Sequence, residues 1–125
     1  MPQRRSILVV DDDDEVRDAI CSLLSLQYDV STAVDGIDGY EKAVAQAPPD
    51  LIISDVSMPR LDGIAMIRRI REHSAFRRVR VIFLTGQVSA PNMMDALCAS
   101  PFAYLPRTTD PGILEEKVKR ALASG

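Results

Sequence analysis

Acidic and hydroxyl side chains follow three short apolar runs of this chain, in each case at the residue where the run ends. They are, in chain order, Asp11 with Asp12, then Asp55, then Thr85. Continuous apolar runs of this length are typical of buried strands in a parallel sheet, and the carboxyl ends of such strands form the edge where ligands bind. If the strands lie side by side, we expect these side chains to converge.

Carboxylates that converge need a positive charge among them. Asp11, Asp12 and Asp55 would repel one another in a partly buried site unless a cation shared the space. No His or Cys joins the set, and oxygen ligands without nitrogen or sulfur favour Mg²⁺, which also binds phosphate. The pattern therefore predicts a magnesium site that supports phosphate chemistry.

The elements that position these residues alternate between strand-like and helix-like patterns. Strands are predicted at 7–10, 28–33, 51–54, 81–84 and 102–105. Helices are predicted after Asp13 or Asp14 to about Gln27, from Gly36 to Pro48, from Gly63 to about His73, from Ser89 onward and from Asp110 onward. Five such βα units predict a three-layer α/β fold, a doubly wound, flavodoxin-like (βα)5 parallel sheet with strand order 2-1-3-4-5.

Length and composition favour one ordinary globular domain over residues 1–125, because 125 residues with 46% hydrophobic side chains can bury a core. Cys21 and Cys98 have neither metal-ligand nor disulfide-framework spacing, so we interpret both as buried thiols in a reducing compartment. The first apolar run is too short for a secretory signal, and no run approaches membrane-spanning length. We expect a cytoplasmic protein that does not contact a membrane.

The net charge of −3 argues against a dedicated nucleic-acid binder. Arginines nevertheless cluster in one stretch: Arg68, Arg69, Arg71, Arg77, Arg78 and Arg80. Only Phe76 interrupts them as an aromatic, so we interpret the stretch as a solvated face and expect no direct nucleic-acid binding.

The motifs taken together resemble the receiver domain of two-component response regulators over essentially the whole chain. The residues that carry the resemblance are Val9-Val10-Asp11-Asp12, Asp55-Val56-Ser57-Met58-Pro59, Leu61-Asp62-Gly63, Thr85-Gly86 and Tyr104-Leu105-Pro106. The resemblance implies that Asp55 accepts a phosphoryl group from a histidine kinase. It also implies that Asp11, Asp12, Asp55 and the backbone carbonyl of Ser57 hold Mg²⁺.

The same resemblance implies a switch. The Thr85 hydroxyl would turn to bind the phosphoryl group, and the ring of Tyr104 would follow it inward and change a partner-binding face. Ser57 and Gln87, each two residues beyond a site residue, would flank the path of an attacking water and tune dephosphorylation.

One position departs from the family pattern. Where relatives have a lysine followed by a cis proline, this chain has Arg107 followed by Thr108. Arginine keeps the charge and can bind phosphate with two nitrogens, although it is longer and planar. Because a cis bond before Thr108 would cost about 2.5–4 kcal/mol, we expect a trans peptide and a loop displaced relative to relatives.

The first functional hypothesis is a phosphoacceptor switch that catalyses only its own phosphorylation and dephosphorylation. Its partners would be a sensor histidine kinase or phosphotransfer protein and a downstream protein or fused output domain, with dimerisation on phosphorylation as a possibility. The alternative is a degenerate receiver that binds partners without phosphate. An aspartyl phosphatase similar to the haloacid dehalogenases is disfavoured, because Ser57 stands where such enzymes need a second aspartate. A flavodoxin-like cofactor carrier is also disfavoured, because the acids after the first strand would repel a flavin phosphate.

Overall fold

The computed structural model describes residues 4–86 and 101–123. Within them lies a parallel sheet with strand order β2-β1-β3-β4-β5, as the alternating pattern predicts. Its strands are β1 (Ser6–Val10), β2 (Asp29–Ala33), β3 (Leu51–Ser54), β4 (Arg80–Thr85) and β5 (Ala103–Pro106).

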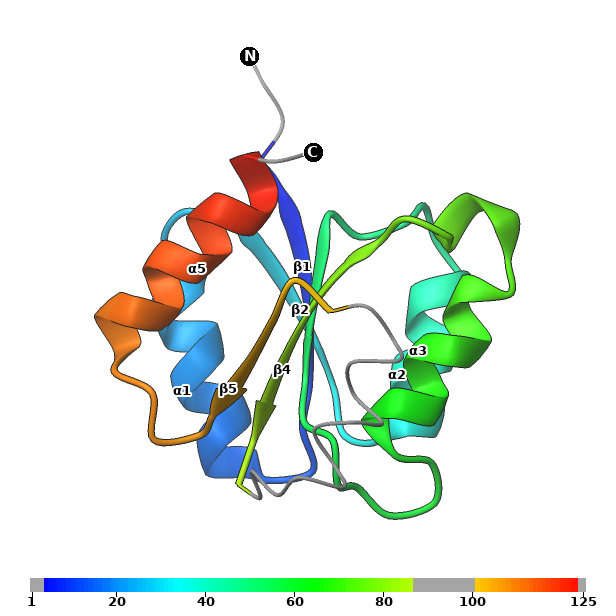
Figure 1. The fold of residues 1–125 in the computed structure, drawn as a ribbon, viewed down its shortest axis with the longest axis horizontal. Coiled ribbons are helices and arrows are strands. Elements are labelled where there is room, and N and C mark those ends of the chain that lie inside the picture. Colours follow the sequence, from blue (N-terminus) through cyan, green and yellow to red (C-terminus); the bar gives the residue numbers. More distant parts are fainter. Residues whose placement is uncertain (1–3, 87–100, 124–125) are drawn as a thin grey trace.

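Helices cover both faces of the sheet. Figure 1 shows α1 (Asp14–Leu24) and α5 (Pro111–Ala123) on one face, and α2 (Gly36–Val44) and α3 (Gly63–Arg71) on the other. Side chains alternate along β1, so Leu8 joins the core under α2 and α3 while Val9 joins the core under α1 and α5. The three-layer arrangement thus follows from strands that are apolar on both sides.

The register brings the ends of the central strands level. Val10 of β1 pairs with Ser54 of β3, and Ser54 pairs in turn with Phe83 of β4. The residues that follow β1 and β3 are therefore neighbours at the carboxyl edge, which is the lower edge of Figure 1, opposite the two termini.

Helix boundaries differ from the expectation by a few residues. Helix α1 ends at Leu24 rather than near Gln27, because the N–H groups of Gln27 and Tyr28 both donate to the Leu24 carbonyl and turn the chain into β2. Helix α3 ends at Arg71, and a short 3₁₀ turn, η1 (Ser74–Phe76), follows it. The helix expected from Ser89 lies outside the described residues.

Two aspartates cap helices where the sequence places a cap. The Asp13 carboxylate accepts hydrogen bonds from the N–H groups of Glu15 and Val16 at the start of α1. At the start of α5, Asp110 accepts one from the N–H of Gly112. The helix starts that lead away from the site edge are therefore fixed by their own caps.

The loop between β3 and α3 is held against the site edge. A Cβ at Gly63 would lie 2.0 Å from the Asp55 carbonyl oxygen, so this close approach requires glycine. Earlier in the loop, Arg60 pairs with Asp35 at 2.5 Å, and Asp35 also caps α2 by accepting from the Asp38 N–H at 2.8 Å. The loop is thus pinned to the β2–α2 turn.

None of the helices in residues 4–86 and 101–123 is long and apolar enough to cross a bilayer.

The Asp35 cap gives the first prediction. Asp35→Ala removes the acceptor for the Asp38 N–H and should lower the free energy of unfolding by about 1 kcal/mol, whereas Asp35→Asn keeps an acceptor oxygen and should cost less. Chemical denaturation followed by circular dichroism at pH 7 measures both. The account is contradicted if the alanine variant is as stable as the wild type.

The stability that Asp35 contributes should depend on pH, because its pKa is lowered in the folded protein. The hydrogen bond from the Asp38 N–H, followed by the one from Arg60, lowers the pKa of Asp35 below its usual value of 3.8. The stability contributed by the ionised form is therefore present above the ordinary pKa and is lost as the pH falls through the lowered one. The difference between wild type and Asp35→Asn should shrink when the same measurement is made in increasingly acidic buffer.

Candidate functional site

Three carboxylates meet where β1 and β3 end. Asp11, Asp12 and Asp55 each offer an oxygen, and these oxygens lie within 4.8 Å of one another. Asp11 is 1% exposed and Asp55 is 3% exposed, while Asp12 faces solvent. The convergence expected from the apolar runs is observed, and its cause is the level register of the two central strands.

Backbone hydrogen bonds orient the two buried carboxylates. Asp11 Oδ1 accepts from the N–H of Asp13 at 2.9 Å, and Asp55 Oδ1 accepts from the N–H of Val56 at 2.7 Å. Asp55 leaves its second oxygen, Oδ2, to accept from Arg107, whereas Asp11 uses Oδ1 for both Asp13 and Arg107. Arg17 of α1 also donates to the Asp11 carbonyl at 2.8 Å and ties the helix to this turn.

A single guanidinium nitrogen joins the acids together. Arg107 Nη2 lies 2.5 Å from Asp55 Oδ2, 3.0 Å from Asp11 Oδ1 and 3.9 Å from Asp12 Oδ1. Arg107 follows β5, where its N–H donates to the Thr85 carbonyl at 2.8 Å. The side chain therefore supplies positive charge to the acidic cluster itself.

The backbone after Arg107 agrees with one expectation from the sequence. The described residues contain no cis peptide bond, so the bond between Arg107 and Thr108 is trans as predicted. The expected displacement of this loop relative to relatives stays a prediction.

Burial dominates the protonation of the cluster. It raises the pKa of Asp11 from 3.8 to about 6, with the hydrogen bond from Asp13 acting against it and the charge of Asp55 adding to it. Burial likewise raises the pKa of Asp55, although Arg107, the Val56 N–H and Thr85 lower it. One guanidinium thus offsets only part of the desolvation, and a further cation would favour the ionised acids.

A small cavity opens above Asp55. Its volume is about 210 Å³, and it is lined by Asp12, Asp55, Ser57, Thr85, Gly86 and Arg107. Thr85 is 1% exposed and its hydroxyl is hydrogen bonded to the Asp55 carboxylate, while Ser57 lies exposed at the rim. Gln87, expected to tune dephosphorylation, lies outside the described residues.

Tyr104 lies on β5, where it pairs with Phe83 of β4, two residues before Thr85. Its ring is partly buried and packs edge-on against Phe83, with the ring centroids 6.4 Å apart. Burial, and then the negative charge of Asp55, raise the pKa of the Tyr104 phenol. The aromatic ring and the carboxylate are therefore close enough to sense each other electrostatically.

The donor set fits a hard divalent cation. Asp11, Asp12 and Asp55 provide carboxylate oxygens, the ligands that Mg²⁺ prefers. Burial raises the pKa of Asp11 and of Asp55, so a bound cation would favour their ionised forms. Arg107 already contacts all three acids, so a cation would share them with its guanidinium.

Sequence reasoning missed some of the supporting contacts. The spacing of Asp14 and Arg17 marks a helical ion pair, which is present, but nothing in it indicates that Arg17 also reaches the Asp11 carbonyl. The pairing of Arg60 with Asp35 joins two loops that are far apart in sequence and leaves no local signal. The contact of Arg107 with the acids themselves was likewise not anticipated.

Comparison with known proteins comes first from a family model. The model described as "Response regulator receiver domain" matches residues 7–119, which include all the carboxylates and Arg107.

Individual relatives fall into short and long proteins. The chain is 32% identical over 120 residues to chemotaxis protein CheY1 of Helicobacter pylori, covering 94% of this chain and 97% of that protein. It is 38% identical over 124 residues to response regulator MprA of a Mycobacterium species, covering 98% of this chain but only 50% of the relative. The chain thus spans nearly all of CheY1 and about half of MprA.

Solved structures agree on the fold. CheY4 of Vibrio cholerae superposes with a TM-score of 0.87 at 28% identity, covering 95% of this chain and 99% of that one. A signal receiver domain from Pseudomonas fluorescens gives a TM-score of 0.89 at 26% identity, covering 98% and 97% of the two chains.

The position of Arg107 gives the second prediction. Arg107→Gln removes the only guanidinium that the described residues place on the carboxylates of Asp11 and Asp55, so the buried acids lose a charged hydrogen-bond donor. Without metal, the variant should lose about 1–3 kcal/mol of unfolding free energy. Added Mg²⁺ should stabilise the variant more than the wild type, because the ion no longer shares the carboxylates with Arg107.

Thermal melts with and without MgCl₂ provide the measurement, and Arg120→Gln is the matched control. Arg120 also pairs with an acid, Glu116, but on the exposed face of α5. An equal response to Mg²⁺ in Arg107→Gln and in the control would show that Arg107 does not share the site with the cation.

Proposed function

Because this chain belongs to the response regulator receiver-domain family, we propose that it is a phosphoacceptor switch in which Asp55 receives a phosphoryl group from a histidine kinase or phosphotransfer protein. The observation that carries the proposal is the Asp55 carboxylate, which forms part of an open cavity between two neighbouring acids, the Arg107 guanidinium and the Thr85 hydroxyl. We assign residues 1–125 to one receiver domain.

The proposed transfer needs a nucleophile and positive charge. An Asp55 oxygen attacks the phosphorus of the donor phosphohistidine, the phosphorus–nitrogen bond breaks, and its electron pair returns to the imidazole nitrogen. Mg²⁺ bound by Asp11, Asp12, Asp55 and the Ser57 carbonyl would neutralise the phosphoryl oxygens. Burial on the floor of the cavity leaves the nucleophile accessible only from the solvent side.

Arg107 has two roles in this proposal. Before transfer it holds the acids together, and after transfer its fork of N–H donors can bind the new phosphoryl oxygens. The guanidinium must leave Asp55 Oδ2, now 2.5 Å away, before that oxygen can attack. Phosphorylation is therefore coupled to a movement of Arg107.

The switch would pass from Thr85 to Tyr104. Transfer of the phosphoryl group replaces the carboxylate that the Thr85 hydroxyl now contacts, and Thr85 would follow the new oxygens. Tyr104 lies on the neighbouring strand, only partly buried, so it has room to repack against Phe83. Ser57 and Gln87 would set how readily water reaches the acyl phosphate.

The output of this switch is a protein surface. We propose a cytoplasmic regulatory domain that passes its state to a downstream protein or a fused output domain, with phosphorylation-dependent dimerisation as one route. We propose neither direct nucleic-acid binding nor turnover of a separate substrate.

The second candidate is a degenerate receiver that binds partners without phosphate. The observation that favours it is Arg107, which already occupies the space between the acids by contacting Asp11, Asp12 and Asp55. If the guanidinium does not leave, the site stays closed to the donor.

Intact-mass spectrometry separates the two candidates and gives the third prediction. After incubation with Mg²⁺ and acetyl phosphate or a phosphorylated donor protein, the wild type should gain the mass of one phosphate group. Asp55→Asn should gain none, because an amide is not a nucleophile for phosphorus. Asp50→Asn controls for the loss of one carboxylate elsewhere, since Asp50 lies at the opposite edge of the sheet near Ser6.

Each outcome decides between the candidates. Absence of any gain in the wild type with donors that modify another receiver under the same conditions supports the degenerate receiver. A gain in Asp55→Asn equal to that of the wild type overturns the assignment of Asp55.

A further inference from the structure

A second cavity lies at the opposite end of the sheet from the acidic cluster. Its volume is about 720 Å³, within the range of small-molecule sites, and it is lined by Arg71, Arg77, Arg78, Val79, Arg80, Pro101 and Phe102. We call these residues the arginine pocket. They come from the end of α3, the turn after η1 and the starts of β4 and β5.

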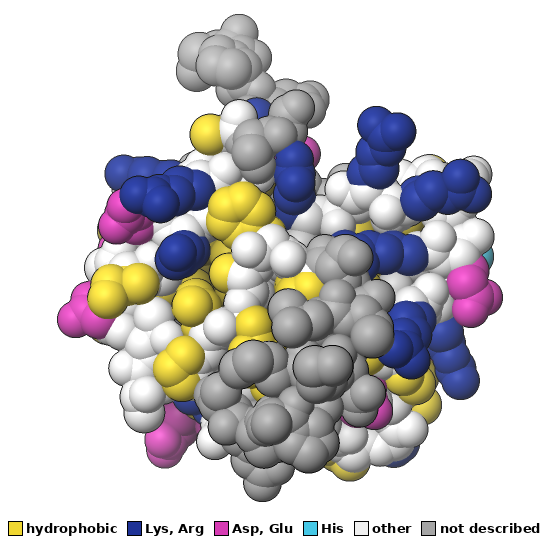
Figure 2. All heavy atoms as spheres, in the orientation of Figure 1, with side chains coloured by type: hydrophobic (Ala, Val, Ile, Leu, Met, Phe, Trp, Pro, Cys, Tyr) yellow, Lys and Arg dark blue, Asp and Glu magenta, His cyan; other side chains and the backbone are white. Residues whose placement is uncertain are grey.

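Among the described residues that line the arginine pocket, none is acidic. Four of these seven residues are arginines, whereas the whole chain has a net charge of −3. Among the ion pairs within residues 4–86 and 101–123, none involves Arg77 or Arg78, and both side chains are exposed. Figure 2 shows Lys and Arg side chains over the upper part of this face, on the α5 side as well as on the α3 side.

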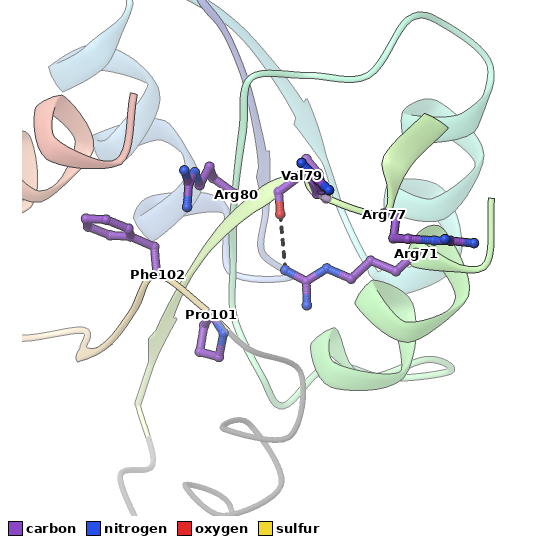
Figure 3. A pocket seen from close by; sticks show the side chains of 7 residues that line it. Arg71, Arg77, Val79, Arg80, Pro101 and Phe102 are labelled. Atoms are coloured by element: carbon purple, nitrogen blue, oxygen red, sulfur yellow. Dashed lines mark hydrogen bonds between the residues drawn. The ribbon is translucent and has the colours of Figure 1, made fainter. Parts of the chain in front are cut away.

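The pocket also has an ordered wall. Arg71 reaches from α3 and its Nη2 donates to the Val79 carbonyl at 3.1 Å, the dashed line of Figure 3. In that view Arg80 and Phe102 lie on the other side of β4 from Arg71, with Pro101 below them. Val79, Pro101 and Phe102 therefore add apolar surface to the arginine side chains of this cavity.

This combination selects a ligand class. Guanidinium groups bind phosphate oxygens through paired N–H donors, and several of them together need a ligand with several negative charges. A cavity of about 720 Å³ is larger than a diphosphate group needs, and the rings can stack on a planar base. We propose that the arginine pocket binds a nucleotide, with its phosphates on the guanidinium groups of the pocket and its base against Phe102 and Pro101.

This assignment changes the interpretation of the basic stretch. Arg68 and Arg69 are exposed on α3 and do not line the cavity, so they remain a solvated face as the sequence indicated. The four arginines that follow them instead share one concave site. A ligand there would contact the starts of β4 and β5; β4 carries Thr85 at its other end, and Tyr104 is the second residue of β5.

The test is an isothermal titration with adenosine diphosphate, pyrophosphate and adenosine in buffer free of divalent cations, so that no metal links the nucleotide to the acidic cluster. Adenosine diphosphate should bind saturably and more tightly than pyrophosphate, while adenosine alone should not bind. Amide NMR shifts should appear at Arg71, at 77–80 and at Phe102, and not at Asp11 or Asp55.

Two matched variants each remove two positive charges. Arg77→Gln with Arg78→Gln should weaken binding of adenosine diphosphate at least about tenfold, since charged hydrogen bonds are lost. Arg68→Gln with Arg69→Gln should change it less than about twofold, as expected for exposed charges outside the site. All four positions are exposed, so both double variants should melt like the wild type.

Several results would overturn the proposal. If both double variants weaken nucleotide binding equally, the arginines attract anions in general and form no specific site. If pyrophosphate and adenosine diphosphate bind with equal affinity, the base makes no contact. The proposal also fails if no saturable binding is observed. Asp55→Asn should bind the nucleotide as the wild type does, so this site and the proposed phosphoacceptor role succeed or fail separately.

Discussion

The structure depends on the repulsion among carboxylates that the sheet forces together. Asp11 and Asp55 are nearly excluded from solvent, and the level ends of β1 and β3 leave them no room to separate. Desolvation raises the pKa of both, even with Arg107 in contact. A site with too little positive charge favours whatever brings more, and it is stable only while something holds the acids in place.

The residues around the acidic cluster hold its carboxylates in place. Hydrogen bonds from the Asp13 and Val56 N–H groups fix the carboxylates, and Gly63 lets the following loop approach the Asp55 carbonyl. The Arg60–Asp35 pair holds the far side of the same loop. These contacts restrict how the edge that carries the acidic cluster can relax.

The sequence predicts the sheet order and the convergence of Asp11, Asp12 and Asp55, because apolar runs that end in acids report both burial and direction. It does not predict where Arg107 points. A guanidinium after β5 can bind a phosphate, lie on the surface or reach the acids. Which position Arg107 takes depends on its electrostatic interaction with Asp11 and Asp55, which are distant in sequence and leave no local pattern. For the same reason the basic stretch divides into exposed arginines on α3 and the arginine pocket only once β4 and β5 are placed.

The most direct test of the central claim is a carboxyl titration by ¹³C NMR in metal-free buffer, repeated with Mg²⁺. If desolvation governs the cluster, Asp11 should titrate near pH 6 and Asp55 above its usual range. Bound Mg²⁺ should lower the apparent pKa of both groups, because the cation favours their ionised forms. Carboxyl groups that titrate near 3.8 and do not respond to Mg²⁺ would contradict the account, because they would lie apart in water rather than together in one buried site.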